Sequence, residues 1–123
     1  MLTLEHPPFL TDLLTDAQLA EVIACFYDAV YVDEQLSPLF EGVPRRQQEQ
    51  RLAGFIRMTR GRSNPFDGDF LRSAHARLAL TPALFARRTQ RMTEAITACG
   101  HGPEVVSCWR RYDALWLRYI RGQ

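Results

Sequence analysis

Apolar residues recur at intervals of three and four along most of the chain, which is the period of an amphipathic helix. The two clearest runs lie near the start and the end of the sequence. They consist of Leu19, Val22, Ile23, Phe26, Tyr27 and Val30, and of Val105, Val106, Trp109, Tyr112, Leu115, Trp116 and Tyr119. No stretch alternates apolar and polar residues as a half-buried strand would. The pattern predicts an all-α protein.

Capping residues and glycines indicate where the helices begin and end. Thr15 followed by Gln18 is a capping-box pattern, and Thr81-Pro82 places a cap before a proline at the first helical position. The long helices are expected from Thr15 to about Val32, Pro44 to Gly61, Thr81 to Gly100, and Pro103 to Tyr119. Shorter helical pieces are expected after a Thr11 cap, at 33–40 and at 70–76.

Length and composition favour one domain spanning residues 1–123 with a single core. The 46% apolar and 24% charged residues are typical of a soluble globular protein. No segment has the roughly 18 uninterrupted apolar residues that a membrane span requires. Cys25, Cys99 and Cys108 are odd in number and lack CxxC spacing, so we expect reduced thiols and a cytoplasmic location.

The charges argue against a nucleic-acid partner. All fifteen basic residues are arginine, and fourteen acidic residues balance them to a net charge of +1. The arginines between positions 45 and 62 are interleaved with glutamines and Glu49 at helical spacing, which is typical of a solvated helix face. Nucleic-acid binding usually requires a larger positive excess.

His75 is the candidate metal ligand. It lies on a short segment after the glycine-rich stretch GRSNPFDGD. A neutral imidazole is the commonest protein ligand for a metal, and one histidine facing apolar helices can hold one iron axially. The alternative is an ordinary half-buried histidine that bonds a backbone carbonyl.

Two stretches resemble the truncated globins. FYDAVYVDEQLSPLF is similar to their Phe-Tyr, Val, acidic, Leu-x-Pro-x-Phe pattern, and FDGDFLRSAHARLAL is similar to the aromatic-x-Gly segment that leads to their proximal histidine. The resemblance extends from about Leu13 to Tyr119 and is nearest to the third subgroup. It implies an all-α, two-over-two helical sandwich around a haem.

The resemblance implies a role for each of five residues. His75 would be the axial ligand of a haem b iron, and Tyr27 the distal hydrogen-bond donor to bound O₂. A phenol inside a low-dielectric pocket stabilises the partial negative charge on such a ligand. Phe40 would pack against the porphyrin, while Phe26 and Phe55 would line the distal wall. As plain core residues, these aromatics would look no different in sequence.

On the helix after Pro44, the resemblance implies further contacts. Gln48 occupies the position of a distal histidine, where an amide still donates a hydrogen bond but ligates ferrous iron poorly. Leu52 would face the ligand. Arg51 at the pocket mouth and Arg72 near His75 could each pair with a haem propionate, or each could be simply solvated.

Arg88 departs from the family pattern, since the second and third subgroups usually have tryptophan there. A buried guanidinium requires a partner, because an unpaired buried charge is costly. Three interpretations stay open. Arg88 points into the distal pocket and favours anionic ligands, it reaches a propionate, or the helix is rotated and Arg88 is solvated. The neighbouring Arg87 leaves room for an error of one residue in register.

The leading functional prediction is a haem globin that reversibly binds O₂ or another small ligand such as NO, CO, cyanide or sulfide. Nitric oxide dioxygenase or peroxidase activity would need a separate reductase, because the chain has no flavin or nicotinamide motif. We expect a monomer or weak homodimer. The alternatives are a haem-free α-helical regulatory or interaction domain, and an enzyme that uses His75 with Asp67 or Asp69 as acid and base.

Overall fold

The computed structural model describes residues 9–58 and 81–121. Within these ranges every regular element is helical and no strand occurs, so the prediction of an all-α fold is confirmed. The elements are α1 (Leu10–Leu13), α2 (Asp16–Val30), the 3-10 helix η1 (Ser37–Phe40), α3 (Arg45–Met58), α5 (Pro82–Ala98) and α6 (Pro103–Arg121).

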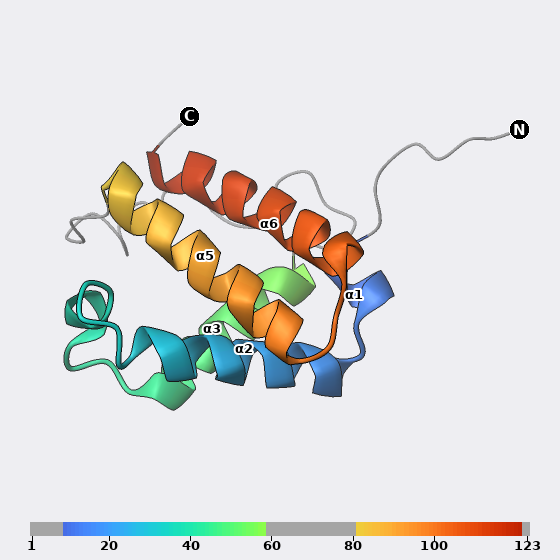
Figure 1. Ribbon diagram of the computed structural model, residues 1–123, viewed down its shortest axis with the longest axis horizontal. Helices are drawn as coiled ribbons and strands as arrows, with labels where there is room; N and C mark the ends of the chain where they lie inside the picture. Colours follow the sequence, from blue (N-terminus) through green and yellow to red (C-terminus); the bar gives the residue numbers. More distant parts are fainter. Residues whose placement is uncertain (1–8, 59–80, 122–123) are drawn as a thin grey trace, which may run out of the picture.

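The long helices form two layers. Helices α2 and α3 pack together as one layer, α5 and α6 as the other, and the most extensive contact between layers is that of α2 with α5. Figure 1 shows α5 and α6 side by side above α2, with α3 behind α2 and the short α1 near the start of α6. The largest buried side chains between the layers include Trp109 and Phe26. This arrangement agrees with the expected helical sandwich.

Caps at the predicted positions fix where α2 and α5 begin. The Thr15 hydroxyl accepts a hydrogen bond from the Gln18 amide at 3.1 Å, and the Gln18 side chain accepts one from the Thr15 amide at 2.9 Å. Thr81 accepts from the Leu84 amide at 3.1 Å in the same way. Both caps satisfy amides that a helix start leaves without an intrahelical partner.

The end of α5 is a glycine turn. Gly100 has a φ of +89°, a conformation that favours glycine because it carries no Cβ. The His101 amide then donates to the Ile96 carbonyl at 3.1 Å. This turn reverses the chain so that α6 runs back along α5.

Two local predictions were wrong. Thr11 does not cap the first short helix but lies inside α1, where Asp12 accepts a hydrogen bond from the Phe9 amide at 3.0 Å. Helix α2 ends at Val30 rather than near Val32. It ends there because the Asp33 amide donates to the Val30 carbonyl at 3.2 Å, a tighter turn than the α-helical one.

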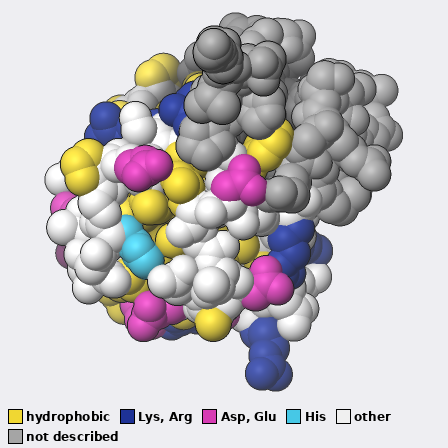
Figure 2. Space-filling view, turned by 90° about the vertical axis from the view of Figure 1, so that its right-hand side faces the viewer, with side chains coloured by type: hydrophobic (Ala, Val, Ile, Leu, Met, Phe, Trp, Pro, Cys, Tyr) yellow, Lys and Arg dark blue, Asp and Glu magenta, His cyan; other side chains and the backbone are white. Residues whose placement is uncertain are grey.

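The surface shows no large patch of one charge on the face seen in Figure 2, where acidic and basic side chains of the described residues are interspersed. Among the described helices, none is long and apolar enough to cross a membrane.

Candidate functional site

An aromatic cluster surrounds Tyr27 near the end of α2. The Tyr27 ring lies 4.8 Å from that of Phe26 and 6.0 Å from those of Tyr31 and Phe40, measured between centroids. Phe40 meets Tyr27 edge-on, at an interplanar angle of 80°. Tyr27 itself is only 4% exposed. The structure therefore brings together three of the residues predicted for the haem site, namely Phe26, Tyr27 and Phe40.

The Tyr27 phenol is held in its neutral form. Burial raises the pKa of Tyr27 to about 12, and the positive charge of Arg88 is the largest effect that opposes this rise. No hydrogen bond is among the causes of the shift. Below that pKa the hydroxyl keeps its proton and can act as a hydrogen-bond donor.

Arg88 is buried at the interface between α5 and α6. Its side chain donates from Nη1 to Oδ1 of Asp113 at 2.9 Å, and its Cζ lies 5.2 Å from the centroid of the Phe26 ring. The residue is 8% exposed, so the interpretation of a rotated helix with a solvated Arg88 is wrong. The neighbouring Arg87 has a different partner and donates from Nε to Asp33.

Asp113 is a site residue that the sequence reasoning missed. It is 5% exposed, and its second carboxylate oxygen, Oδ2, has no hydrogen-bond partner within the described ranges. A signal for it existed in the sequence. Asp113 follows Val105 and Trp109 at intervals of four residues, so it continues the apolar face of α6 just as Arg88 interrupts that of α5.

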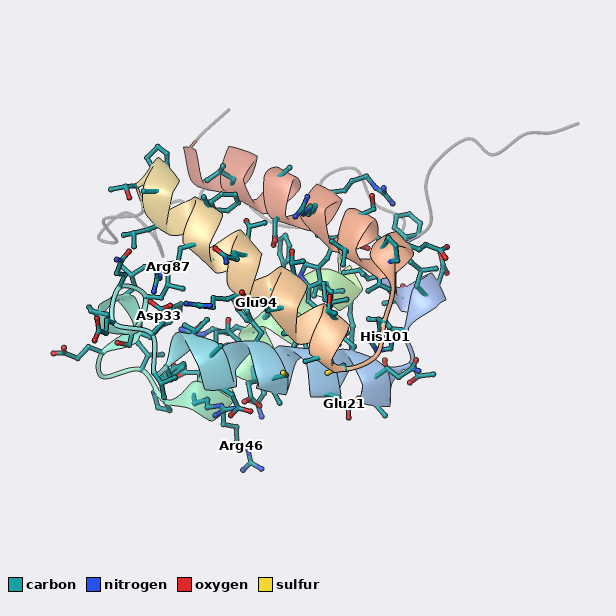
Figure 3. The ribbon with its side chains drawn as sticks, viewed as in Figure 1. Glu21, Asp33, Arg46, Arg87, Glu94 and His101 are labelled. Atoms are coloured by element: carbon teal, nitrogen blue, oxygen red, sulfur yellow. The ribbon has the colours of Figure 1, made fainter. Side chains whose placement is uncertain are left out.

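A second carboxylate, that of Asp33, joins the corner after α2 to α5. Asp33 Oδ1 accepts from Arg87 Nε at 2.8 Å and from the Gln35 and Leu36 amides at 2.8 and 3.0 Å, while Oδ2 accepts from Arg91 Nε at 2.9 Å. Figure 3 shows Arg87 and Asp33 beside one another at this end of the molecule. The two arginines and the backbone amides hold the pKa of Asp33 far below its usual range. Sequence reasoning missed this cluster as well.

The other residues predicted for the haem site differ in exposure, and some lie outside the described residues. On α3, Phe55 is buried, Gln48 and Leu52 are half-buried, and Arg51 is exposed. His75 and Arg72 lie outside the described residues, as do Asp67 and Asp69 of the acid–base alternative. The predicted axial ligand is therefore not tested by this structure.

The aromatic residues around Tyr27 fit the apolar wall of a haem site. Within residues 9–58 and 81–121, no group of three or more His, Cys, Asp or Glu side chains could hold a metal. A haem needs only one axial protein ligand, apolar walls and a few placed polar groups. Phe26, Phe40 and Phe55 provide aromatic walls, and Tyr27 provides a buried donor between them.

A surface depression of about 530 Å³ lies beside this cluster, at the corner between α2 and α3. Tyr31 and Phe40 line it together with Ser37, Pro38 and residues 41–44. The Tyr31 hydroxyl closes the corner by donating to the Val43 carbonyl at 3.0 Å. The depression therefore shares two rings with the cluster around Tyr27.

Residues 12–111 match the family model of the bacterial-like globins. The chain belongs to the bacterial-like globin family. No curated protein matches the chain. For this globin, family membership means haem binding and agrees with the helical sandwich.

Proposed function

We propose that this globin binds haem b through His75 and reversibly takes up O₂ or another small ligand, with Tyr27 and Gln48 as distal hydrogen-bond donors. The haem, when bound, supplies an iron with one coordination position open to the ligand. The observation that carries the proposal is the buried, neutral phenol of Tyr27 within an aromatic cluster between the helical layers.

The chain's own residues have distinct tasks in this proposal. Tyr27 donates a hydrogen bond in a site from which burial excludes most water, so the bond is stronger than in solution. Phe26 and Phe40 hold the phenol ring in place through their edge and tilted contacts. Gln48 is half-buried on α3 and supplies an amide that can donate without titrating. Exposed Arg51 would pair with a haem propionate.

A haem titration of the purified protein tests the proposal. We expect a sharp Soret band, a ferrous form that shifts with CO, and stoichiometric binding. His75→Ala should lose normal coordination, and added imidazole should restore it. His101→Ala is the matched control, because His101 lies at the turn between α5 and α6, away from Asp33 and the Tyr27 end of α2 (Figure 3).

A spectrum of His75→Ala that is the same as that of the parent protein would contradict the assignment of His75. Weak, substoichiometric haem binding by the parent would instead favour the haem-free regulatory or interaction domain. Tyr27→Phe should bind haem normally and release O₂ faster, because only the hydrogen bond to the ligand is removed.

A further inference from the structure

Arg88 brings a permanent positive charge into the interior beside the proposed distal donor. Its guanidinium lies over the face of the Phe26 ring, whose neighbour along α2 is Tyr27. The Arg88 charge is also felt at the Tyr27 phenol, where it lowers the pKa more than any other charge changes it. The cation therefore acts electrostatically on the proposed distal donor.

Asp113 does not cancel the effect of the Arg88 charge on Tyr27. The two charges form a dipole, and the effect of Asp113 on the Tyr27 pKa is the smallest of the named causes, whereas that of Arg88 is the largest of the charge effects. Arg88 is also the member of the pair that lies over the Phe26 ring, whose centroid is 4.8 Å from that of Tyr27. Asp113 accepts from Arg88 through Oδ1, while its Oδ2 has no hydrogen-bond partner within the described ranges.

We propose that Arg88, anchored by Asp113, determines the ligand preference of the pocket and selects small monovalent anions, such as hydrosulfide, nitrite or azide, over neutral ligands. This proposal rests on the proposed haem function. A charge in a site of low effective dielectric attracts an anion far more strongly than it would in water, while a neutral ligand gains little. Tyr27 is present in the parent and in every variant compared below, so a change in discrimination between them comes from Arg88.

Azide and imidazole are the probes, because one is an anion and the other a neutral ligand of ferric haem. Their dissociation constants are measured by spectral titration of the haem-loaded protein at fixed pH and ionic strength. The informative variant is Arg88→Met/Asp113→Asn, because it removes both charges and leaves the interior neutral. Arg87→Met is the matched control, since it removes the adjacent charge, which contacts Asp33 instead.

We expect the double variant to bind azide about tenfold or more weakly, as loss of a nearby charge in a partly buried site implies. The double variant should bind imidazole as tightly as the parent does. Arg87→Met should bind both azide and imidazole as the parent does. Asp113→Asn alone should strengthen azide binding, because it removes the opposing charge. A ratio of azide to imidazole affinity that is the same in the parent and the double variant would overturn the proposal.

A spectroscopic readout is independent of affinity. The C–O stretching frequency of the ferrous CO complex falls in a positive field, so the double variant should shift it upward and Arg87→Met should not. If the parent protein fails to bind haem, the proposed function fails and this inference fails with it. Normal haem binding with an unchanged affinity ratio and C–O frequency overturns only the role of Arg88.

Discussion

Arg87 and Arg88 are neighbours on α5, yet they belong to two different charge clusters. Arg87 and Arg91 both pair with Asp33 in a partly exposed group, called the rim cluster below. Arg88 lies in the interior and pairs with Asp113, and these two residues are called the inner pair. Successive residues on a helix point about 100° apart, so one step along the chain separates a half-exposed side chain from a buried one. The same residue type therefore serves two purposes within one helical turn.

The two carboxylates differ in how fully they are satisfied. Asp33 receives hydrogen bonds from two guanidinium groups and two backbone amides, and its side chain is 1% exposed. Asp113 receives one from Arg88, and its other oxygen has no partner in the described part of the chain. A saturated carboxylate fixes structure, whereas an under-coordinated one in a core needs another explanation. In the inference above, Asp113 anchors the positive charge of Arg88 beside the Phe26 ring.

The largest expected effect comes from breaking the inner pair. Asp113→Ala leaves the Arg88 charge buried without its carboxylate and should lower the free energy of unfolding by about 3–5 kcal/mol. Urea unfolding followed by circular dichroism measures it. Arg88→Met/Asp113→Asn should recover most of the loss, because neither charge remains. Equal losses in the single and double variants would show that the cost does not come from leaving Arg88 without its carboxylate partner.

The rim cluster should contribute to stability without affecting ligand choice. Asp33→Ala removes the acceptor for two backbone amides and two arginines, and we expect a loss of about 2–3 kcal/mol, less than a fully buried pair because the arginines remain solvated. Asp33→Asn is the matched variant. It keeps an acceptor for the amides and should lose less. A changed ratio of azide to imidazole affinity in either variant would contradict the claim that Asp33 and its arginines do not affect ligand choice.

Acid titration isolates the charge of Asp33. Because its pKa is depressed in the folded protein, the carboxylate contributes stability above its unfolded pKa of about 3.9. This contribution is lost as the pH falls from there toward the folded value. The difference in unfolding free energy between the parent and Asp33→Asn should therefore be constant near neutral pH and shrink below about pH 4. A difference that does not change with acid would contradict the assignment.

The smallest effect should come from the outer edge of the rim cluster. Arg91 also donates to Glu94 at 2.9 Å, but Glu94 is 51% exposed and the pair is screened by water. Glu94→Gln should change the unfolding free energy by less than about 0.5 kcal/mol. A loss above about 1 kcal/mol, measured in the same urea series, would mean that the network acts as a unit rather than through Asp33.

Local sequence signals predicted much of the fold. The caps at Thr15 and Thr81 and the glycine stop at position 100 act within a few residues, so the sequence contains both partners of each hydrogen bond close together. The end of α2 was misjudged because the Asp33 side chain caps the following turn, which the apolar spacing does not reveal.

The site was predicted only in part. Phe26, Tyr27 and Phe40 were named from the family resemblance, whereas Tyr31, which packs against Tyr27 and Phe40, was missed. Asp113 and Asp33 were missed because their arginine partners are 25 and 54 residues away. A charge at an apolar position of α5 and an opposite charge at an apolar position of α6 would have suggested the inner pair. His75 stays a prediction.

The assignment of His75 as the iron ligand is tested most directly by the resonance Raman spectrum of the ferrous, ligand-free protein. The protein is produced both with ordinary histidine and with ¹⁵N-labelled histidine. The account predicts an iron–imidazole stretching band that moves to lower frequency with the label and disappears in His75→Ala. The same band in His75→Ala, or a spectrum insensitive to the label, would contradict the claim that this globin holds its haem iron through His75.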